Sequence, residues 1–299
     1  MRLVPGTGNV GSSDLAEQLS ALSLVPGDAV FVEGAMAELG PVVGGARAVV
    51  EALISVLGSQ GLLMMPAFSS DALLPALPEN SAEAERARVE ACVPGYDPSL
   101  SPADLSGTLA ETFRRWPGVE RSTHPVYSIA ALGPDAGEAV AQHPRDWAMG
   151  PEGPMGRLLE QREPKLLMIG RSWAASAALV MAETMARHRR LRVLRFKDTS
   201  RQPFRWVHAR DTALDDGALF ETVGQRFERT GHVTIGAMAA ATARLCRLDE
   251  LLAHAAPSIA FSNLQTGTAS PHASPTPSQP DRRRQGAAYE PRRGTPATY

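Results

Sequence analysis

The spacing of apolar and polar positions predicts alternating helices and strands from the start of the chain. Ser12-Ser13-Asp14 can cap a helix whose apolar residues recur at helical spacing to about residue 23. Apolar runs at 29–32 and 62–65 are typical of buried strands, and an amphipathic helix over 48–57 lies between them. This helix–strand–helix–strand order is a crossover unit, which predicts a parallel or mixed sheet.

The rest of the chain continues this alternation after one long interruption. Residues 71–104, rich in proline, alanine and acids, are expected to cross the surface as a long loop, and such loops are often functional. Beyond them we expect helices at 105–116, 135–142, 217–230 and 248–256, strands at 126–132, 166–169 and 232–235, and either a hairpin or two sheet-edge segments at 192–196 and 204–207.

The composition changes sharply at residue 257. The stretch 257–299 is rich in Pro, Ser, Thr and Arg and nearly free of aliphatic residues, so it cannot bury enough apolar surface to offset chain entropy. We therefore expect one folded domain over residues 1–256 and a disordered tail over 257–299. Arg282-Arg283-Arg284 could attract a polyanion, but a solvated tail is the simpler interpretation.

Composition narrows the class of protein. Of the 299 residues, 43% are hydrophobic and 21% charged, as in an ordinary globular protein, and the net charge of −2 gives no reason to expect nucleic acid as a partner. Cys92 and Cys246 form no CxxC motif, so neither a disulfide framework nor a cysteine metal site is expected. Without a signal-like apolar segment or a run of about 20 apolar residues, we expect a cytoplasmic protein that has no membrane partner.

The stretch from residue 166 to 187 is expected to carry a residue that takes part in the chemical reaction. The apolar run 166–169 ends at Gly170, and an alanine-rich helix that carries Glu183 follows. A strand, a tight turn and a helix often place a side chain at the mouth of an α/β site. Glu183 shares a helix face with Val180. It is either a functional carboxylate or a surface group that points to water.

Two loops carry further candidates. In PVVGGA, before the helix at 48–57, paired glycines and a helix N-terminus could approach an anion such as phosphate. The motif fits neither a Walker A loop nor a dinucleotide fingerprint, and a plain turn explains it equally well. In RSTHP, His124 is of a type that titrates near neutrality, and Arg121 with Ser122 could hold a phosphate or carboxylate. A structural or merely exposed histidine is the alternative.

Several common catalytic classes are disfavoured. The other histidines show no HxxxH or HExxH spacing, which argues against metal catalysis and leads us to expect no metal. No GxSxG elbow is present, which argues against the common α/β serine hydrolases.

Five segments, in a fixed order, carry a more specific signal: LVPGDAVFVEGAMAELGPVVGGARAVVEAL, GLLMMPAFS, YDPSLSP, GTLAETFRRWPGVERSTHPVYSIAALGPDA and FETVGQRFERTGHVTIGAMAAATARL. In this combination they resemble the antibiotic N-acetyltransferase family, whose best-known members are the aminoglycoside 3-N-acetyltransferases. The resemblance runs from about Leu19 to Ala256, nearly the whole expected domain.

The resemblance implies a fold and a reaction. The fold would be a three-layer α/β/α arrangement with a mixed central sheet, distinct from the GNAT acetyltransferase fold. Acetyl-CoA would be the co-substrate, and the acceptor would be a small-molecule amine, in the best-known members an aminoglycoside antibiotic that is thereby inactivated. A homodimer is compatible with the resemblance.

The resemblance also suggests residues for each substrate. Asp71 and Asp97 would suit a polycationic acceptor, because carboxylates pair with ammonium groups. The residues expected on the CoA side are Glu33, Gly34, Ala35, Val43, Gly44, Gly45, Ser69, Arg121, Ser122 and Ser128.

The chain departs from its family at the central helix. Typical members read roughly NTSLHLAE, and the His three residues before the Glu is taken as the catalytic base. This chain reads SAALVMAE, so Glu183 is kept while Val180 occupies the His position. The HSS that ends the first strand in typical members is Glu33-Gly34-Ala35 here. Valine can neither accept a proton nor orient a carboxylate.

An alkylammonium must lose a proton before it can attack a thioester, and a positioned base typically contributes about 10²–10⁴-fold. Glu183 is the leading catalytic candidate and His124 the second, with Glu33 as a further substitute. Neither cysteine has a nucleophile context, so direct transfer is expected. The alternatives are a catalytically impaired family member that binds CoA or a cationic small molecule, and a secondary-metabolism acyltransferase with another acceptor.

Overall fold

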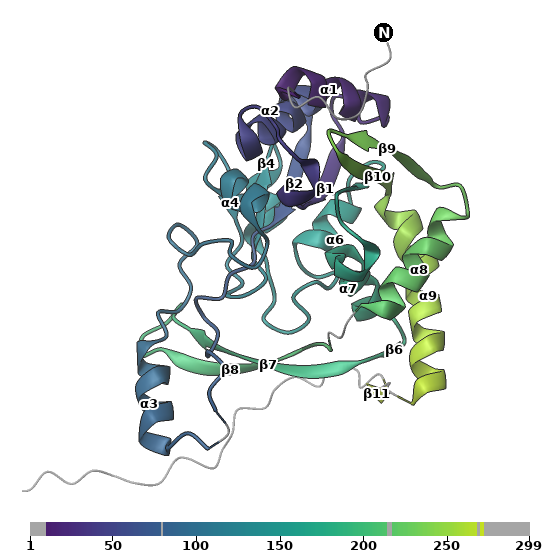
Figure 1. Cartoon of the computed structure of the whole chain (residues 1–299). Coiled ribbons are helices and arrows are strands. Elements are labelled where there is room, and N and C mark those ends of the chain that lie inside the picture. The colour runs from purple at the N-terminus through teal and green to yellow at the C-terminus, as the bar shows by residue number, and fades with distance from the viewer. Residues whose placement is uncertain (1–9, 79, 214–216, 268–269, 272–299) are drawn as a thin grey trace, which may run out of the picture.

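A mixed sheet of seven strands lies at the centre of the protein. Figure 1 shows the computed structural model of the whole chain. The structure describes residues 10–78, 80–213, 217–267 and 270–271. Strands β2, β1 and β5 are parallel at the centre, and the outer strands are antiparallel to their neighbours. In spatial order the strands are β3 (Glu120–Arg121), β4 (Ile129–Leu132), β2 (Leu62–Pro66), β1 (Ala29–Gly34), β5 (Lys165–Ile169), β10 (Ala241–Arg247) and β9 (Val233–Met238).

The central strands separate two hydrophobic cores. Successive side chains of a strand point to opposite faces, so Val30 and Val32 enter one core and Phe31 the other. Every residue of β1 from Ala29 to Glu33 is buried. Burial on both faces is what a parallel strand covered by helices on both sides requires, and it explains why the strand is a continuous apolar run in the sequence.

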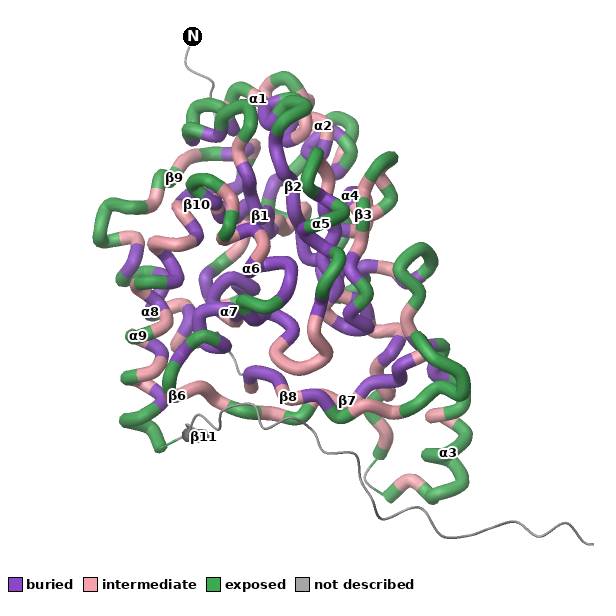
Figure 2. Tube along the Cα trace, turned by 180° about the vertical axis from the view of Figure 1, so that it is seen from behind, coloured by how far each residue is buried: buried purple, intermediate pink, exposed green. Residues whose placement is uncertain are grey.

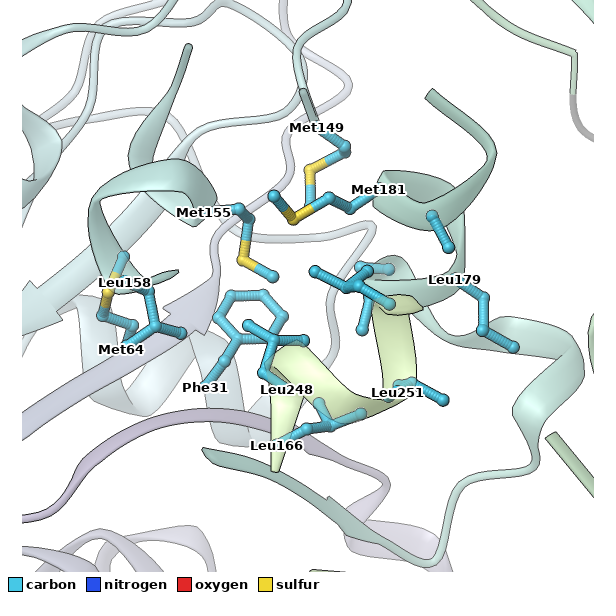
Figure 3. Packing of buried hydrophobic residues seen from close by; sticks show 14 of the residues in the cluster. Phe31, Met64, Met149, Met155, Leu158, Leu166, Leu179, Met181, Leu248 and Leu251 are labelled. Carbon is cyan, nitrogen blue, oxygen red and sulfur yellow. The ribbon is translucent and has the colours of Figure 1, made fainter. Parts of the chain in front are cut away.

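Helices cover both faces of the sheet. On the Val30 side lie α1 (Ser12–Ala21), α2 (Gly45–Leu57) and α4 (Thr108–Arg114). On the Phe31 side lie α5 (Ala136–Ala141), α6 (Pro154–Leu159), α7 (Ala177–Met185), α8 (Ala218–Glu228) and α9 (Leu248–Thr266). Figure 3 shows the second core, where Phe31 lies among Met155, Met181 and Leu248. The expected three-layer α/β/α arrangement with a mixed sheet is confirmed.

A long hairpin lies apart from the main sheet, at the opposite end of the molecule from α1 (Figure 1). Strands β7 (Leu191–Asp198) and β8 (Arg205–Thr212) pair only with each other as regular strands, so the hairpin interpretation was correct. The isolated bridge Leu73–Phe196 ties the hairpin to the loop after β2, and a small cluster around Phe196 fills the junction. Figure 2 shows a mixture of buried, intermediate and exposed residues along this hairpin, whereas β1 is buried at every residue before Gly34.

Some elements differ from the sequence-based expectation. The expected surface loop contains α3 (Glu83–Cys92), which buries none of its residues and therefore has no apolar stripe to signal it. Strand β10 was not predicted, although it lies beside β5 in the main sheet. The remaining short elements are η1 (Met36–Leu39), η2 (Gly58–Gln60), η3 (Trp173–Ala175), β6 (His188–Arg189) and β11 (Ser270–Pro271).

The last helix is longer than expected. We predicted its end at residue 256, but α9 continues through Pro257 to Thr266. Ile259 and Asn263, one turn apart, are buried on the same face, and this packing outweighs the helix-breaking tendency of proline. The first part of the expected tail is therefore helical, and residues 272–299 lie outside the described part of the chain. Among the described helices, none is long and apolar enough to cross a membrane.

Candidate active site

A cavity of about 310 Å³ opens where the central parallel strands end. Glu33 of β1, Pro66 of β2 and Arg171, just after β5, lie along it. Its other walls come from the loop after β2, the start of α7, the β7–β8 hairpin and Phe220 of α8. In sheets with parallel strands, ligands bind at this carboxyl edge, so the cavity is the candidate active site.

Glu33 is the buried carboxylate of the cavity. It follows Phe31 by two residues and therefore points to the side of the sheet that α7 covers. Its Oε1 accepts the backbone N–H of Ala178 at 3.1 Å and the Ser176 hydroxyl at 3.3 Å. Burial raises the pKa of Glu33 to about 7, although Arg171 and the hydrogen bonds from α7 act in the opposite direction. At neutral pH the carboxyl is therefore divided between its charged and neutral forms.

Arg192 and Asp211 form the second charged group in the lining. They are cross-strand partners in the β7–β8 hairpin, and Arg192 Nη2 donates to Asp211 Oδ2 at 2.7 Å. Arg192 also donates to the Tyr127 hydroxyl, which lines the same cavity. With Glu33 and Arg171, the lining carries two carboxylates and two guanidinium groups.

The rest of the wall is mostly apolar. Val180, on the first turns of α7, lines the cavity together with Phe68, Met149 and Phe220. The residue at the family's His position therefore does face the candidate site. Its isopropyl group adds apolar surface there but no acid or base.

The structure places Glu183 outside the cavity lining. The side chain is fully buried on α7, and both its oxygens accept from the Arg190 guanidinium, Oε1 from Nε at 2.7 Å and Oε2 from Nη2 at 2.7 Å. The Arg190 backbone N–H and Asn263 Nδ2 also donate to Oε1. The alternative of a surface carboxylate that points to water is therefore wrong, and the prediction of a catalytic Glu183 has no support from the cavity lining.

His124 is also buried away from the cavity. Its Nδ1 accepts the backbone N–H groups of Val126 and Tyr127 at 3.2 and 2.9 Å, which leaves Nε2 to donate to the Arg145 carbonyl at 3.3 Å. Burial, with His143 beside it, lowers the pKa of His124 well below its usual range. Both ring nitrogens are thus engaged in holding the loop, and the ring is neutral.

The polar residues expected beside His124 also bond to the fold itself. Ser122 Oγ pairs with His143 Nδ1 at 2.8 Å and accepts the Ile129 N–H. Ser128 donates its hydroxyl to the Ala67 carbonyl. The Arg121 guanidinium donates to Ser128 Oγ and to the backbone carbonyls of Ala67, Pro98 and Ser101. None of the three lines the cavity.

The residues expected on the CoA side fall in different places. Glu33 lines the cavity, and Gly34 and Ala35 follow it directly at the strand end. Ser69 is a buried residue of the loop after β2. Val43 and Gly44 lie in a separate, open depression with the N-terminus of α1, and Gly45 begins α2 beside it. The structure therefore does not bring the glycine loop and the strand end into one cavity.

The acidic residues expected on the acceptor side are not in the cavity lining. Asp97 Oδ1 accepts the backbone N–H groups of Ser99 and Leu100, so its carboxylate stabilises its own turn. Asp71 lies beside a different, shallower depression near α3. The acidic group that the cavity does contain on the hairpin side is Asp211.

Three charged residues of the cavity were missed in the sequence. Arg171 follows Gly170 directly after a buried strand, a position that could have drawn attention to it. Arg192 and Asp211 are 19 residues apart, and their pairing follows only from the register of the hairpin. Within the described ranges, no three His, Cys, Asp or Glu side chains gather in a way that could hold a metal ion.

Comparison with known proteins agrees with this architecture. The chain is 35% identical over 234 residues to aminoglycoside N(3)-acetyltransferase IX of Micromonospora chalcea, covering 74% of this chain and 79% of that protein. Its fold matches the crystal structure of YokD from Bacillus subtilis with a TM-score of 0.78 and 27% identity, covering 87% and 96% of the two chains. It matches the binary complex of AAC-IIIb with CoASH with a TM-score of 0.74 and 25% identity, covering 89% and 100%.

The family assignment rests on the length of the match as well as on its strength. The family model of aminoglycoside 3-N-acetyltransferases matches residues 31–259, which span all seven strands of the main sheet except the first residues of β1. The matched region includes every residue that lines the cavity. The chain therefore belongs to the aminoglycoside 3-N-acetyltransferase family.

Proposed function

We propose that this protein transfers the acetyl group of acetyl-CoA to an amino group of an aminoglycoside-like antibiotic, as an antibiotic-resistance enzyme. Family membership supports the reaction class, the name of the Micromonospora relative supports the acceptor, and the AAC-IIIb complex with CoASH supports the co-substrate. Acetylation turns an ammonium group into a neutral amide, so it weakens every interaction that an antibiotic makes through that charge.

The observation that carries the proposal is the composition of the cavity. It combines carboxylates that can hold an ammonium group, Glu33 and Asp211, with apolar surface from Phe68, Val180 and Phe220. At about 310 Å³ it is at the small end of ligand pockets, which span about 300–1,000 Å³. It therefore suits the reacting ends of two substrates whose larger parts extend outside.

The chemistry requires no covalent enzyme intermediate. The neutral amine nitrogen attacks the thioester carbonyl carbon, the C–N bond forms and the C–S bond breaks, and the proton lost by nitrogen is balanced by the proton gained by the CoA thiolate. The apolar wall would hold the acetyl group and the adjacent pantetheine. The buried thiol of Cys246 is a poor nucleophile, because burial raises its pKa.

A second acceptor class is favoured by a specific observation. The two carboxylates in the lining are matched by two guanidinium groups, and most of the remaining wall is apolar. A polycation gains little from a site without net charge. This composition suits an acceptor with few ammonium groups, which is the alternative of a secondary-metabolism acyltransferase.

The test is CoA thiol release from acetyl-CoA, measured with aminoglycosides of different charge and with simple apolar amines. Release that depends on an aminoglycoside, with an N-acetylated product by mass spectrometry, supports the proposal. Faster release with a weakly charged amine supports the second acceptor class. CoA binding by calorimetry without release for any amine overturns both and favours a catalytically impaired binding protein.

A further inference from the structure

Two buried polar atoms at the same cavity have no hydrogen-bond partner within the described part of the chain: Glu33 Oε2 and Arg171 Nε. Leaving a buried donor or acceptor unsatisfied destabilises the folded protein, and more so when the group is charged. Such atoms are rare in folded proteins and need an explanation. Here an acceptor, Glu33 Oε2, and a donor, Arg171 Nε–H, both lack a partner among the described residues beside one cavity. A polar ligand bound in the cavity would supply the missing hydrogen bonds.

Both residues are held by rigid elements. Glu33 pairs with Met168 across β1 and β5, and its Oε1 is fixed by the start of α7, so that only Oε2 remains free. Arg171 lies two residues after the end of β5, and its carbonyl accepts from Arg244 of β10. Functional side chains on a sheet edge are held more precisely than side chains on loops.

We propose that Glu33 is the general base of the acetyl transfer and that the Arg171 Nε–H stabilises the thioester oxygen; this rests on the proposed function. Glu33 Oε2 takes the proton from the acceptor nitrogen as the C–N bond forms. The carbonyl oxygen becomes negative and accepts a hydrogen bond from Arg171. When the C–S bond breaks, the proton passes from Glu33 to the CoA sulfur, which leaves as a neutral thiol.

The other candidate bases are already engaged. Glu183 is saturated by Arg190 and Asn263, and Asp211 is paired with Arg192. His124 uses both ring nitrogens outside the cavity. Among the described carboxylates and histidines of the cavity and its surroundings, Glu33 alone has both a free buried atom and a place in the lining.

The ionisation of Glu33 suits this role. Its pKa of about 7 is close to a neutral working pH, which is the optimum for a general base. The charged or titratable groups around it are Arg171 after β5, Cys246 on β10, and Arg192 and Asp211 in the same lining. Arg171 lowers the pKa of Glu33, so Arg171 supports the base as well as the oxyanion.

The first test is Glu33→Gln, which keeps an acceptor for the Ala178 N–H but cannot take a proton. We expect kcat for thiol release to fall about 10²–10⁴-fold, with CoA affinity by calorimetry within about twofold of wild type. Glu160→Gln, at an exposed carboxylate paired with Arg157, is the matched control and should leave kcat unchanged. A Glu33→Gln protein that folds and keeps its kcat overturns the assignment while the proposed function stands.

The second test is the pH profile, which does not depend on the folding of the Gln variant. Wild-type kcat should rise through an apparent pKa near 7, because the ionised carboxylate is the active form. Arg171→Gln should move this limb to higher pH and lower kcat. A wild-type kcat that does not rise near pH 7 contradicts the proposal. A rise whose apparent pKa is the same in wild type and Arg171→Gln contradicts it as well. Absence of turnover in wild type overturns the proposed function and the base together.

A third test uses the apolar position beside the carboxylate. Val180 lines the same cavity, so Val180→His places an imidazole near the same substrates. The double variant Glu33→Gln with Val180→His should have a kcat at least tenfold higher than that of Glu33→Gln alone. No recovery in a folded, CoA-binding double variant would mean that a missing proton acceptor does not explain the loss.

Discussion

Glu183 and Arg190 form a bidentate ion pair in the interior, with both N–O distances at 2.7 Å. The Glu183 side chain is fully buried and that of Arg190 is 12% exposed. Asn263 of α9 donates to the same carboxylate and to the His188 carbonyl. The pair therefore joins α7, the segment before the hairpin and the end of the last helix.

Breaking this pair should destabilise the fold rather than the chemistry. We expect Glu183→Gln to lower the free energy of unfolding by about 3 kcal/mol, because it leaves a largely buried guanidinium without its counter-charge. Urea denaturation measures the loss. The specific activity of the folded fraction should stay within about threefold of wild type.

The control for this prediction is the double variant Glu183→Leu with Arg190→Met, which removes both charges. It should be more stable than Glu183→Gln, since two apolar groups leave no unpaired charge. A Glu183→Gln protein of wild-type stability whose activity falls a hundredfold would instead assign the carboxylate to catalysis, as the sequence first suggested.

Asp211→Asn should weaken binding of a cationic acceptor. The change leaves Arg192 without its carboxylate and gives the lining a net positive charge, because Glu33 alone then opposes two guanidinium groups. We expect KM for the acceptor to rise about tenfold, equivalent to about 1.4 kcal/mol, while KM for acetyl-CoA changes little. Steady-state kinetics with each substrate varied in turn separates the two effects.

Adding Arg192→Gln to Asp211→Asn restores the charge balance and serves as the control. If charge is the cause, the double variant recovers most of the acceptor KM. An acceptor KM that is equally poor in both variants would show that the hairpin acts through shape.

His143 should make the fold sensitive to acid. Its Nε2 donates to the Ala148 carbonyl at 2.8 Å and its Nδ1 faces the Ser122 hydroxyl, and burial lowers its pKa to about 4. The unfolded chain binds this proton near pH 6.5, so the free energy of unfolding falls as pH drops from about 6.5 to about 4. The full effect is about 3 kcal/mol.

The measurement is urea denaturation at a series of pH values, compared with His143→Gln, whose slope in this window should be shallower. His124 acts in the same direction, because its pKa is also lowered, so the slope should not vanish. His208→Gln, at an exposed position on β8, is the control and should keep the wild-type slope. Equal slopes in His143→Gln and wild type would contradict the prediction.

The end of α9 should be needed for stability. A chain that stops after Ala256 loses the buried side chains of Ile259 and Asn263. We expect its free energy of unfolding to be lower by at least about 2 kcal/mol, the contribution of one buried aliphatic side chain. A chain that stops after Pro271 keeps α9 and the pairing of β6 with β11, and it should match the full chain in thermal unfolding, since the sequence beyond is poor in aliphatic residues. Equal stability of the two truncations would contradict this role.

The parts of the fold that could be predicted from the sequence are those with a strong apolar pattern. Buried parallel strands are continuous apolar runs, so β1, β2 and β5 were found almost to the residue. Strand β10 was missed because two of its four buried positions are alanine and its two partly buried positions are arginine, which weakens the apolar pattern. The helix α3 buries none of its residues and so leaves no apolar stripe in the sequence, and it contacts the hairpin through polar groups such as Glu90, which pairs with Arg195.

The site was less accessible to sequence reasoning, because the role of a polar residue depends on its partners. Glu183 and His124 have suitable chemistry, but their contacts are with Arg190 and with loop backbone. Arg192 meets Asp211 only through the hairpin register. Glu33 was expected on the CoA side by resemblance, and nothing in the sequence indicates that one of its oxygens lacks a partner among the described residues.

The two halves of the cavity wall have separate structural origins. The carboxyl edge of the main sheet supplies Glu33 and Arg171, whereas Arg192 and Asp211 come from a hairpin that forms its own two-stranded sheet. The hairpin strands take no part in the pairing of β1 with β5 that positions Glu33. If Glu33 is the base, as we propose, the choice of amine and the transfer of the proton depend on different structural elements, so substitutions in the hairpin can change the acceptor while the proton-transfer groups on the main sheet stay the same.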